Sequence, residues 1–156
     1  MKISDILTEN LVLSGLEGSS KDEIIDAMID LVATSPKVID KSKVREAIFE
    51  REKIMSTGVG NGFAIPHGKT DAVSDIVAAF ATTAQPIDYQ SLDEKPVRLV
   101  FLIVGKDSMV GPHIKLLSRI SRLMSKEEFR KGLLESKSPK SILDMFKQEE
   151  ATYFEA

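Results

Sequence analysis

Three side chains in this sequence have types and positions that could support chemistry. The chain contains only two histidines, and both lie in unusual places. His67 stands between Pro66 and Gly68, so that proline restrains the approaching backbone and glycine leaves one side of the ring uncrowded. His113 falls in the first turn of a predicted helix, on the same side as its apolar stripe. Arg51 occupies a position where the periodicity of another predicted helix favours a hydrophobic side chain.

Each of these residues also has an ordinary structural interpretation. His67 could be a surface histidine in a loop, and His113 could be half-buried against the leucines that follow it. Arg51 could be a cation near a helix C-terminus, where the helix dipole favours positive charge, with its stem lying on apolar surface. None of the three is decisive alone, so the functional prediction depends on their combination.

Two imidazoles and one guanidinium suit a phosphoryl group. A neutral imidazole is a good nucleophile near its reference pKa of ~6.5. Phosphoryl transfer spreads charge over the equatorial oxygens, and its catalysis is mostly positioning and electrostatic stabilisation. Arg51 could bind two of these oxygens at once, and His113 at a helix N-terminus could donate a hydrogen bond to another. We therefore predict that His67 is a nucleophile that carries a phosphoryl group, and we expect neither a metal nor another cofactor.

Other catalytic chemistries fit the sequence less well. The two histidines could hold a metal together with a carboxylate such as Asp71, but HExxH-like spacing and cysteine are both absent. No GxSxG segment is present for a serine nucleophile. Residues 58–62 read GVGNG rather than GxGxxG and precede no clear βαβ unit, so a dinucleotide site is not expected. A P-loop lysine motif is absent as well.

Apolar periodicity and capping signals predict the helices that position these residues. The first predicted helix is opened by a capping box at Ser20 and Glu23 and ended by residues 34–36, and the second spans about 40–55. The third spans about 112–124 with Gly111 as N-cap. A second capping box at 125–128 opens a short helix to about 135, and the last helix starts at Ser138. The inward stripe of the second helix is predicted to comprise Val44, Ala47, Ile48, Arg51 and Met55.

The remaining segments predict a sheet and a loop. Residues 76–82 and 97–104 are predicted strands, and the second is apolar almost throughout, so we expect it to be covered on both faces. Residues 56–68 are predicted to form a glycine-punctuated loop that carries His67. Helices before and after central strands predict an α/β fold with one sheet between two helical layers, a three-layer α/β/α sandwich.

Composition and charge restrict the class of protein. With 42% hydrophobic and 29% charged residues in 156, the chain is typical of one soluble globular domain, which we expect to span 1–150 with 151–156 as a C-terminal tail. A net charge of −3 argues against nucleic acid as a partner. The longest apolar run, 99–104, is far shorter than the ~20 residues of a membrane span, and no secretory signal is recognisable. We therefore expect a cytoplasmic protein that does not insert into membranes.

The sequence around the three candidate residues resembles a known family. Residues 51–68, REKIMSTGVGNGFAIPHG, are similar to the active-site region of the IIA component of the bacterial phosphoenolpyruvate-dependent sugar phosphotransferase system. The branch is the mannitol/fructose type, which includes the nitrogen-regulatory IIA proteins. Residues 112–123, PHIKLLSRISRL, resemble it more loosely, and the similarity spans about 3–147. Phe63 stands where the family often has a smaller aliphatic residue, a difference that concerns local packing.

The resemblance implies a fold and a role for each candidate residue. The family fold is a single mixed β-sheet flanked by helices on both faces, so residues 1–150 would form one type-2 IIA phosphotransferase domain. His67 would be phosphorylated by a phosphocarrier protein of the same system, which would make the chain an enzyme component acting through a phosphohistidine intermediate. Arg51 would stabilise the phosphoryl group, and His113 would lie beside His67 and donate a hydrogen bond to that group.

The resemblance leaves two outputs open. A sugar-specific IIA protein passes the phosphoryl group to a IIB component and so to a sugar such as fructose or mannitol, whereas a nitrogen-regulatory IIA protein binds regulatory targets according to its phosphorylation state. A chain of 156 residues has no room for a fused IIB or membrane domain, which slightly favours the regulatory type. The alternative from another class is a non-catalytic regulatory module whose pocket binds phosphate or a metal. The phosphorylated ring nitrogen of His67 and the oligomeric state do not follow from the sequence.

Overall fold

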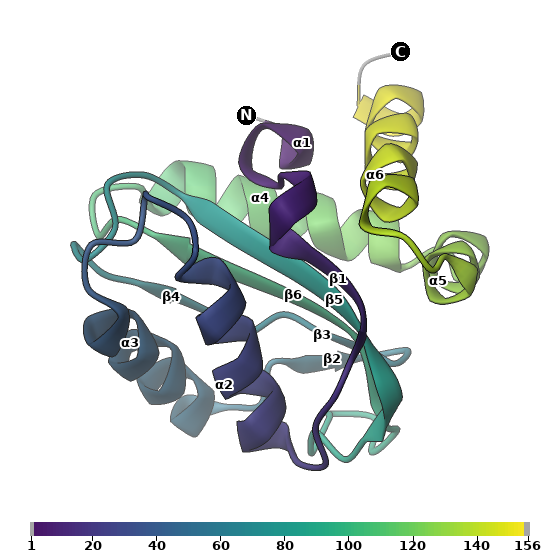
Figure 1. The fold of residues 1–156 in the computed structure, drawn as a ribbon, viewed down its shortest axis with the longest axis horizontal. Helices are drawn as coiled ribbons and strands as arrows, with labels where there is room; N and C mark the ends of the chain where they lie inside the picture. Colours follow the sequence, from purple (N-terminus) through teal and green to yellow (C-terminus); the bar gives the residue numbers. More distant parts are fainter. Residues whose placement is uncertain (1, 155–156) are drawn as a thin grey trace.

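The computed structural model describes residues 2–154 and arranges them around one six-stranded sheet (Figure 1). The strands are β1 (Val12–Leu16), β2 (Gly58–Gly60), β3 (Phe63–Ala64), β4 (His67–Lys69), β5 (Val77–Ile87) and β6 (Val97–Gly105). The helices are α1 (Ile3–Ile6), the short 3-10 turn η1 (Glu9–Leu11), α2 (Lys21–Val32), α3 (Lys41–Ile54), α4 (Val110–Met124), α5 (Glu127–Glu135) and α6 (Pro139–Phe154). Within residues 2–154, no helix is both long enough and apolar enough to cross a membrane.

The sheet is mixed, with strand order β1-β5-β6-β3-β2 and with β4 also paired to β6. β5 and β6 run antiparallel at its centre, whereas β3 and β4 both run parallel to β6. β3 and β4 pair with successive parts of one edge of β6, because Phe63 lies opposite Leu99 and His67 lies opposite Ile103. This pairing places His67 near the carboxyl end of β6.

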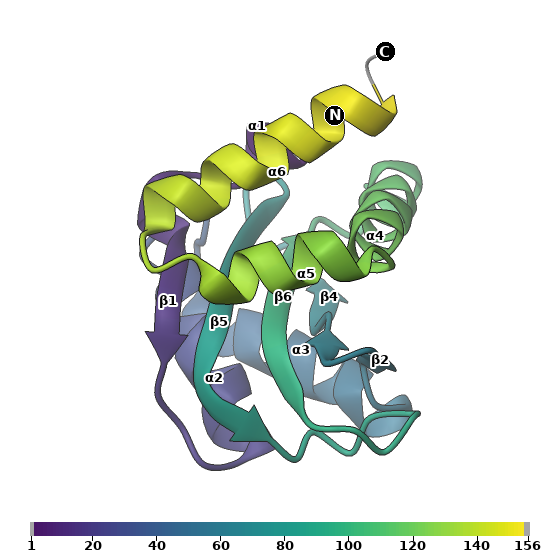
Figure 2. The same cartoon turned by 90° about the vertical axis from the view of Figure 1, so that its right-hand side faces the viewer.

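Two hydrophobic cores lie on opposite faces of the sheet, because successive side chains of a strand point to opposite sides. Phe101 and Ile103 belong to the core beneath α1, α4, α5 and α6, whereas Leu102 and Val104 belong to the core beneath α2 and α3. Figure 2 shows α5 and α6 on the near side of the sheet and α2 and α3 behind it. The predicted α/β fold, with one sheet between helical layers, is therefore confirmed, as is the burial of β6 on both faces.

The segment 56–68, predicted as a loop, contains strand structure instead. It includes β2 and β3, and it ends in the first residues of β4. These strands are two or three residues long and rich in glycine, so they carry too little periodicity to be recognised in the sequence. They form because the long, apolar β6 offers an edge with which they can pair. His67 is consequently a strand residue rather than a loop residue.

The beginning of α4 also differs from the prediction. The helix begins at Val110 with Met109 as its N-cap, so Gly111 lies inside the first turn rather than capping it. His113 nevertheless remains at the N-terminal end, because its backbone amide donates to the carbonyl of Met109 at 3.0 Å. His113 is buried on the inward side of the helix together with Leu116, as the spacing predicted.

The first of the two predicted capping boxes forms in part, because Ser20 caps the helix but Glu23 reaches back to Ser19 rather than to the N-cap residue itself. The Ser20 hydroxyl accepts the amide of Glu23 at 3.2 Å and caps α2, while the Glu23 carboxylate accepts from the backbone of Ser19 at 2.9 Å. The box predicted at 125–128 is wrong, because Ser125 ends α4 and its hydroxyl donates backwards to the carbonyl of Arg122 at 2.6 Å. α5 still follows directly, from Glu127.

α6 covers the sheet through an aromatic cluster. Phe146 is fully buried and packs edge-on against Phe80 and Phe101 of the central strands, with ring centroids 5.1 and 5.6 Å away. Phe129 of α5 packs against the same ring at 5.3 Å. The helix continues to Phe154 and so occupies most of the segment 151–156 that was expected to be a tail.

Replacing Phe146 with alanine should lower the free energy of unfolding by about 3–5 kcal/mol, because it removes the ring on which three other aromatic side chains pack. Urea denaturation measures this loss. Leu92→Ala serves as the control, since Leu92 is 62% exposed and its truncation should change stability by less than about 0.5 kcal/mol. Equal effects of the two substitutions would contradict the cluster's role.

Candidate functional site

The approach of β4 to α3 brings the first two candidate residues together. A β-carbon on Gly68 would lie 3.1 Å from the backbone carbonyl carbon of Ala47, so the absence of a side chain allows the strand to lie close against the helix. Arg51 follows Ala47 by one helical turn and therefore lies on the same side of α3. His67 directly precedes Gly68 in β4. Both Arg51 and His67 consequently line the same hollow.

A hydrogen bond fixes the orientation and tautomer of the half-buried His67 ring. Nδ1 lies 2.8 Å from the carbonyl oxygen of Ile65. A carbonyl oxygen can only accept, so Nδ1 carries the proton and donates it. Nε2 is therefore the ring nitrogen with a free lone pair. This geometry distinguishes the two ring nitrogens, which the sequence left open.

The hollow beside His67 measures about 680 Å³ and joins all three candidate residues. Arg51 enters it from α3, His67 from β4 and His113 from α4. The two imidazole rings lie 5.7 Å apart between centroids, with their planes inclined by 51°. The structure thus brings together residues that are 46 positions apart in the chain, a proximity that the helix and strand predictions could not supply.

His113 is a buried polar side chain without a partner. It is 3% exposed, and neither ring nitrogen has a hydrogen-bond partner among the described residues. The ring fits against β6 because residue 105 is glycine, where a β-carbon would lie 2.9 Å from its Nδ1. Buried polar atoms without partners are rare in native proteins, and they commonly mark positions with a functional reason.

Burial also keeps both imidazoles neutral. Burial, with smaller contributions from the nearby His67 and Lys69, lowers the pKa of His113 to about 4. Burial likewise lowers the pKa of His67, helped by the charges of Arg51 and Lys69, although the Ile65 carbonyl opposes this shift. At neutral pH both rings are therefore uncharged, which is the form in which an imidazole can act as a nucleophile.

The position of Arg51 on α3 differs in part from the prediction. The buried residues of this helix are Val44, Ile48 and Glu52, whereas Arg51 lies half-buried beside this stripe. Met55 is 56% exposed rather than inward, because α3 ends at Ile54 and residue 55 adopts an extended backbone. The Arg51 guanidinium donates from Nη1 to the Met55 carbonyl at 3.0 Å, which holds its head at the helix end.

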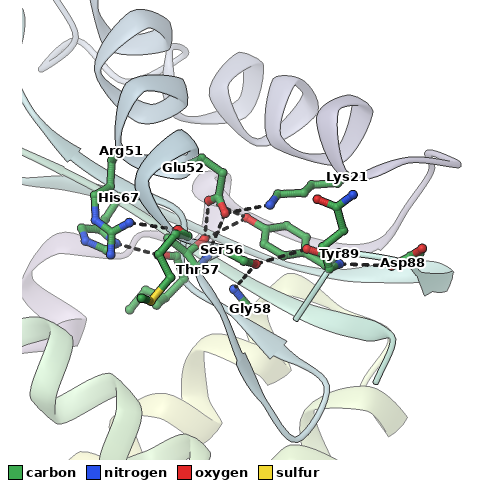
Figure 3. A network of polar contacts seen from close by, with 12 residues as sticks. Lys21, Arg51, Glu52, Ser56, Thr57, Gly58, His67, Asp88 and Tyr89 are labelled. Carbon is green, nitrogen blue, oxygen red and sulfur yellow. Dashed lines mark hydrogen bonds and ion pairs between the residues drawn. The ribbon is translucent and has the colours of Figure 1, made fainter. Parts of the chain in front are cut away.

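Two further residues of the site were not predicted. Lys69 lines the hollow two residues after His67, and its charge acts on both imidazoles. Glu52 is 8% exposed and accepts hydrogen bonds from Thr57 and Tyr89 (Figure 3). Its spacing of four from Ile48 places it on the apolar stripe, which is the signal that could have identified it.

The charges around the hollow favour an anionic group. Arg51 and Lys69 contribute positive charge, whereas Lys53 is already paired with Glu50 at 3.1 Å. Asp107 is the other acidic residue that lines the hollow besides Glu50. Within residues 2–154, no three histidine, cysteine or carboxylate side chains converge as a metal site would require. The arrangement can therefore stabilise an anion at His67 through the positive charges of Arg51 and Lys69.

A mixed α/β domain with two adjacent imidazoles is the arrangement expected of a IIA component. The family described as "Phosphoenolpyruvate-dependent sugar phosphotransferase system, EIIA 2" matches residues 5–149. The chain belongs to this family, and the resemblance recognised from residues 51–68 is confirmed.

Relatives of both functional types are similar to the chain. It is 39% identical over 148 residues to the fructose-specific EIIABC component of Bacillus subtilis, covering 95% of this chain but 23% of that protein. It is 38% identical to the fructose-specific EIIA component of Haloferax volcanii, covering 93% of this chain and 96% of that one. It is 34% identical to a nitrogen regulatory protein of Bradyrhizobium diazoefficiens, and the match covers 97% of this chain and 99% of that protein. The structure of IIA-Ntr from Neisseria meningitidis superposes with a TM-score of 0.86, at 30% identity over 92% of this chain and 98% of that chain.

The buried His113 should make stability depend on pH. Its pKa in the folded state, about 4, lies below the ordinary value, so between these values the unfolded chain binds a proton that the folded chain does not. Stability should therefore fall as pH decreases through this window, by about 2–3 kcal/mol between about pH 7 and about pH 4.5. Urea denaturation of the wild type and of His113→Gln at both pH values isolates this contribution. Identical pH dependence in the two proteins would contradict it.

Proposed function

We propose that His67 accepts a phosphoryl group from the phosphohistidine of a phosphocarrier protein and passes it on, which makes the chain a phosphotransferase component. The observation that carries the proposal is the fixed tautomer of His67, which leaves Nε2 free in a hollow shared with Arg51 and His113. Membership of the EIIA family supports it, because the components of this system act on phosphoryl groups.

The transfer step requires neither a metal nor an external base. The lone pair of His67 Nε2 forms the bond to phosphorus as the bond between phosphorus and the donor nitrogen breaks. The donor imidazole leaves with the electron pair of the broken bond. The His67 ring gains positive character, which strengthens the hydrogen bond from Nδ1–H to the Ile65 carbonyl. That carbonyl therefore stabilises the charge that develops on the nucleophile.

The neighbouring side chains stabilise the transferred group. The Arg51 guanidinium has several N–H donors, so it can bind equatorial oxygens while Nη1 remains on the Met55 carbonyl. His113 is neutral and can donate one hydrogen bond to another oxygen, which would satisfy a ring nitrogen that has no partner in the protein. Lys69 adds a second positive charge at the rim. These contacts suit the charge distribution of phosphoryl transfer.

The phosphorylated state serves either of two outputs. A phosphoryl group adds about −1.5 to −2 charge to a cationic hollow, which changes the surface that a partner meets. The acceptor is a sugar-specific IIB component or a regulatory protein that binds one charge state. Chain length does not favour the regulatory output over sugar transport. The match covers 96% of the fructose-specific EIIA component from Haloferax volcanii, so a sugar-specific relative has a similar length. Incubating the phosphorylated protein with a fructose-type IIB component separates the two outputs.

Incubation with phosphoenolpyruvate, the first enzyme of the system and its phosphocarrier protein should add one phosphoryl group to the wild type. His67→Gln should gain none, because it lacks the nucleophile but keeps a neutral polar side chain. Intact mass spectrometry measures the gain, and circular dichroism checks the fold of the variant. A non-catalytic module predicts no covalent gain in the wild type. Labelling of His67→Gln at the wild-type rate would place the acceptor elsewhere.

Arg51→Ala should slow phosphoryl uptake by about 10²–10³-fold while preserving the fold. The reason is that an arginine that stabilises such a transition state in other proteins raises the rate by a factor of ~10³–10⁵. Quench-flow measurements with the phosphorylated carrier give the rate. Arg45→Ala is the matched control on the same helix, since Arg45 pairs with Asp26 at the exposed surface and such pairs contribute little. Wild-type kinetics in Arg51→Ala would reduce Arg51 to a cation at a helix end.

A further inference from the structure

We infer that Glu52 is a positioning residue whose buried carboxylate joins the end of α3 to Thr57 and thereby places both Arg51 and His67 for transfer. Figure 3 shows Glu52 at the centre of a polar network, with Arg51 and His67 at one side of it. The inference rests on the proposed function of His67 as the phosphoryl acceptor.

The Glu52 carboxylate has hydrogen-bond donors on both oxygens. Oε2 accepts the backbone amide of Thr57 at 2.7 Å and lies 3.0 Å from Nζ of Lys21. Oε1 accepts the hydroxyl of Thr57 at 2.5 Å and that of Tyr89 at 3.2 Å. A buried carboxylate is tolerated only when it is paired and hydrogen-bonded in this way, and the loss of one partner is costly. The end of α3 is therefore tied firmly to residue 57.

One branch of this network leads to Arg51. The bonds between Glu52 and Thr57 close a turn over residues 52–57, and the Met55 carbonyl lies inside that turn. This carbonyl accepts from Nη1 of Arg51 at 3.0 Å. Since the helix has already ended, no helical hydrogen bond fixes the Met55 carbonyl. Its direction depends on the closed turn, and the position of the guanidinium depends on that carbonyl.

The other branch leads to His67. The Thr57 carbonyl accepts the amide of Ile65 at 2.9 Å, so residue 57 also anchors the strand segment that precedes the nucleophile. The Ile65 carbonyl in turn accepts from Nδ1 of His67 at 2.8 Å. Thr57 is therefore the point at which both branches meet, and Glu52 is the group that holds Thr57.

Lys21 and Tyr89 support the carboxylate from outside the turn 52–57, and the Tyr89 hydroxyl also lies 3.0 Å from the hydroxyl of Thr57. Lys21 is the first residue of α2 and compensates the buried charge. Tyr89 is fully buried, and burial together with the charge of Glu52 raises its pKa, so the hydroxyl stays protonated and donates. Removing the Tyr89 hydroxyl would weaken the network but leave both bonds between Glu52 and Thr57. Tyr89→Phe is therefore a matched comparison for a substitution of Glu52.

Glu52→Gln tests the inference, because an amide offers one acceptor atom where the carboxylate offers two. The kcat for phosphoryl uptake should fall about 30–100-fold, since displacement by about 1 Å can cost ~10²-fold. The KM for the phosphorylated carrier should stay within about threefold of the wild-type value, because Glu52 does not line the hollow. The reaction should still end at one phosphoryl group per chain. Glu46→Gln, an exposed exchange on the same helix, should leave the rate unchanged.

Tyr89→Phe separates positioning from stability. It should lower the melting temperature but keep kcat within about threefold of the wild type, because the Thr57 bonds remain. In ¹⁵N NMR of the unphosphorylated proteins, His67 should be protonated at Nδ1 in the wild type and in Tyr89→Phe. Glu52→Gln should instead show a mixture of the two tautomers.

Two results would overturn the inference. One is a folded Glu52→Gln with wild-type kcat and the wild-type tautomer, and the other is equal slowing by Glu52→Gln and Tyr89→Phe, which would trace the loss to stability. If the glutamine variant does not fold, Thr57→Val removes only the hydroxyl bonds and should slow uptake by about threefold to tenfold, whereas Thr57→Ser should restore it. If the wild type takes up no phosphoryl group, the proposed function fails, and the tautomer comparison alone still decides whether Glu52 positions His67.

Discussion

The hydrogen bond from Nδ1 of His67 to the Ile65 carbonyl is the interaction on which the chemistry of this site depends. It decides which ring nitrogen has a free lone pair, and it holds the ring against rotation. The bond spans only two residues, and the pairing of β3 and β4 with successive parts of one edge of β6 fixes the backbone on either side of it. Close contact between Gly68 and Ala47 then sets α3, with Arg51, beside the ring.

The two histidines share a hollow but have different environments. His67 is half-buried and uses one nitrogen on a carbonyl, whereas His113 is buried with neither nitrogen paired. Both rings are kept neutral, as the proposed roles of His67 as nucleophile and His113 as hydrogen-bond donor require, while the positive charge comes from Arg51 and Lys69. This division of roles lets an anion enter without first displacing a proton from the nucleophile.

The three candidate side chains could be singled out from the sequence, whereas much of the backbone that carries them could not. Arg51, His67 and His113 stood out by type and position, and they line one hollow. The strands within 56–68 were missed because they form only against β6, a contact between distant segments that local periodicity does not contain. Glu52 was overlooked because a glutamate in a helix is usually solvated, and its burial depends on partners from α2 and from the segment after β5.

The central claim is that Nε2 of His67 forms the bond to phosphorus while Nδ1 keeps its proton on the Ile65 carbonyl. NMR of the ¹⁵N-labelled protein after incubation with the phosphorylated carrier tests this directly, because the two nitrogens of a phosphohistidine differ in chemical shift and in coupling to ³¹P. Coupling of phosphorus to Nε2 of His67, with Nδ1 protonated, is the predicted result. Phosphorus on Nδ1, or on any residue other than His67, would contradict it.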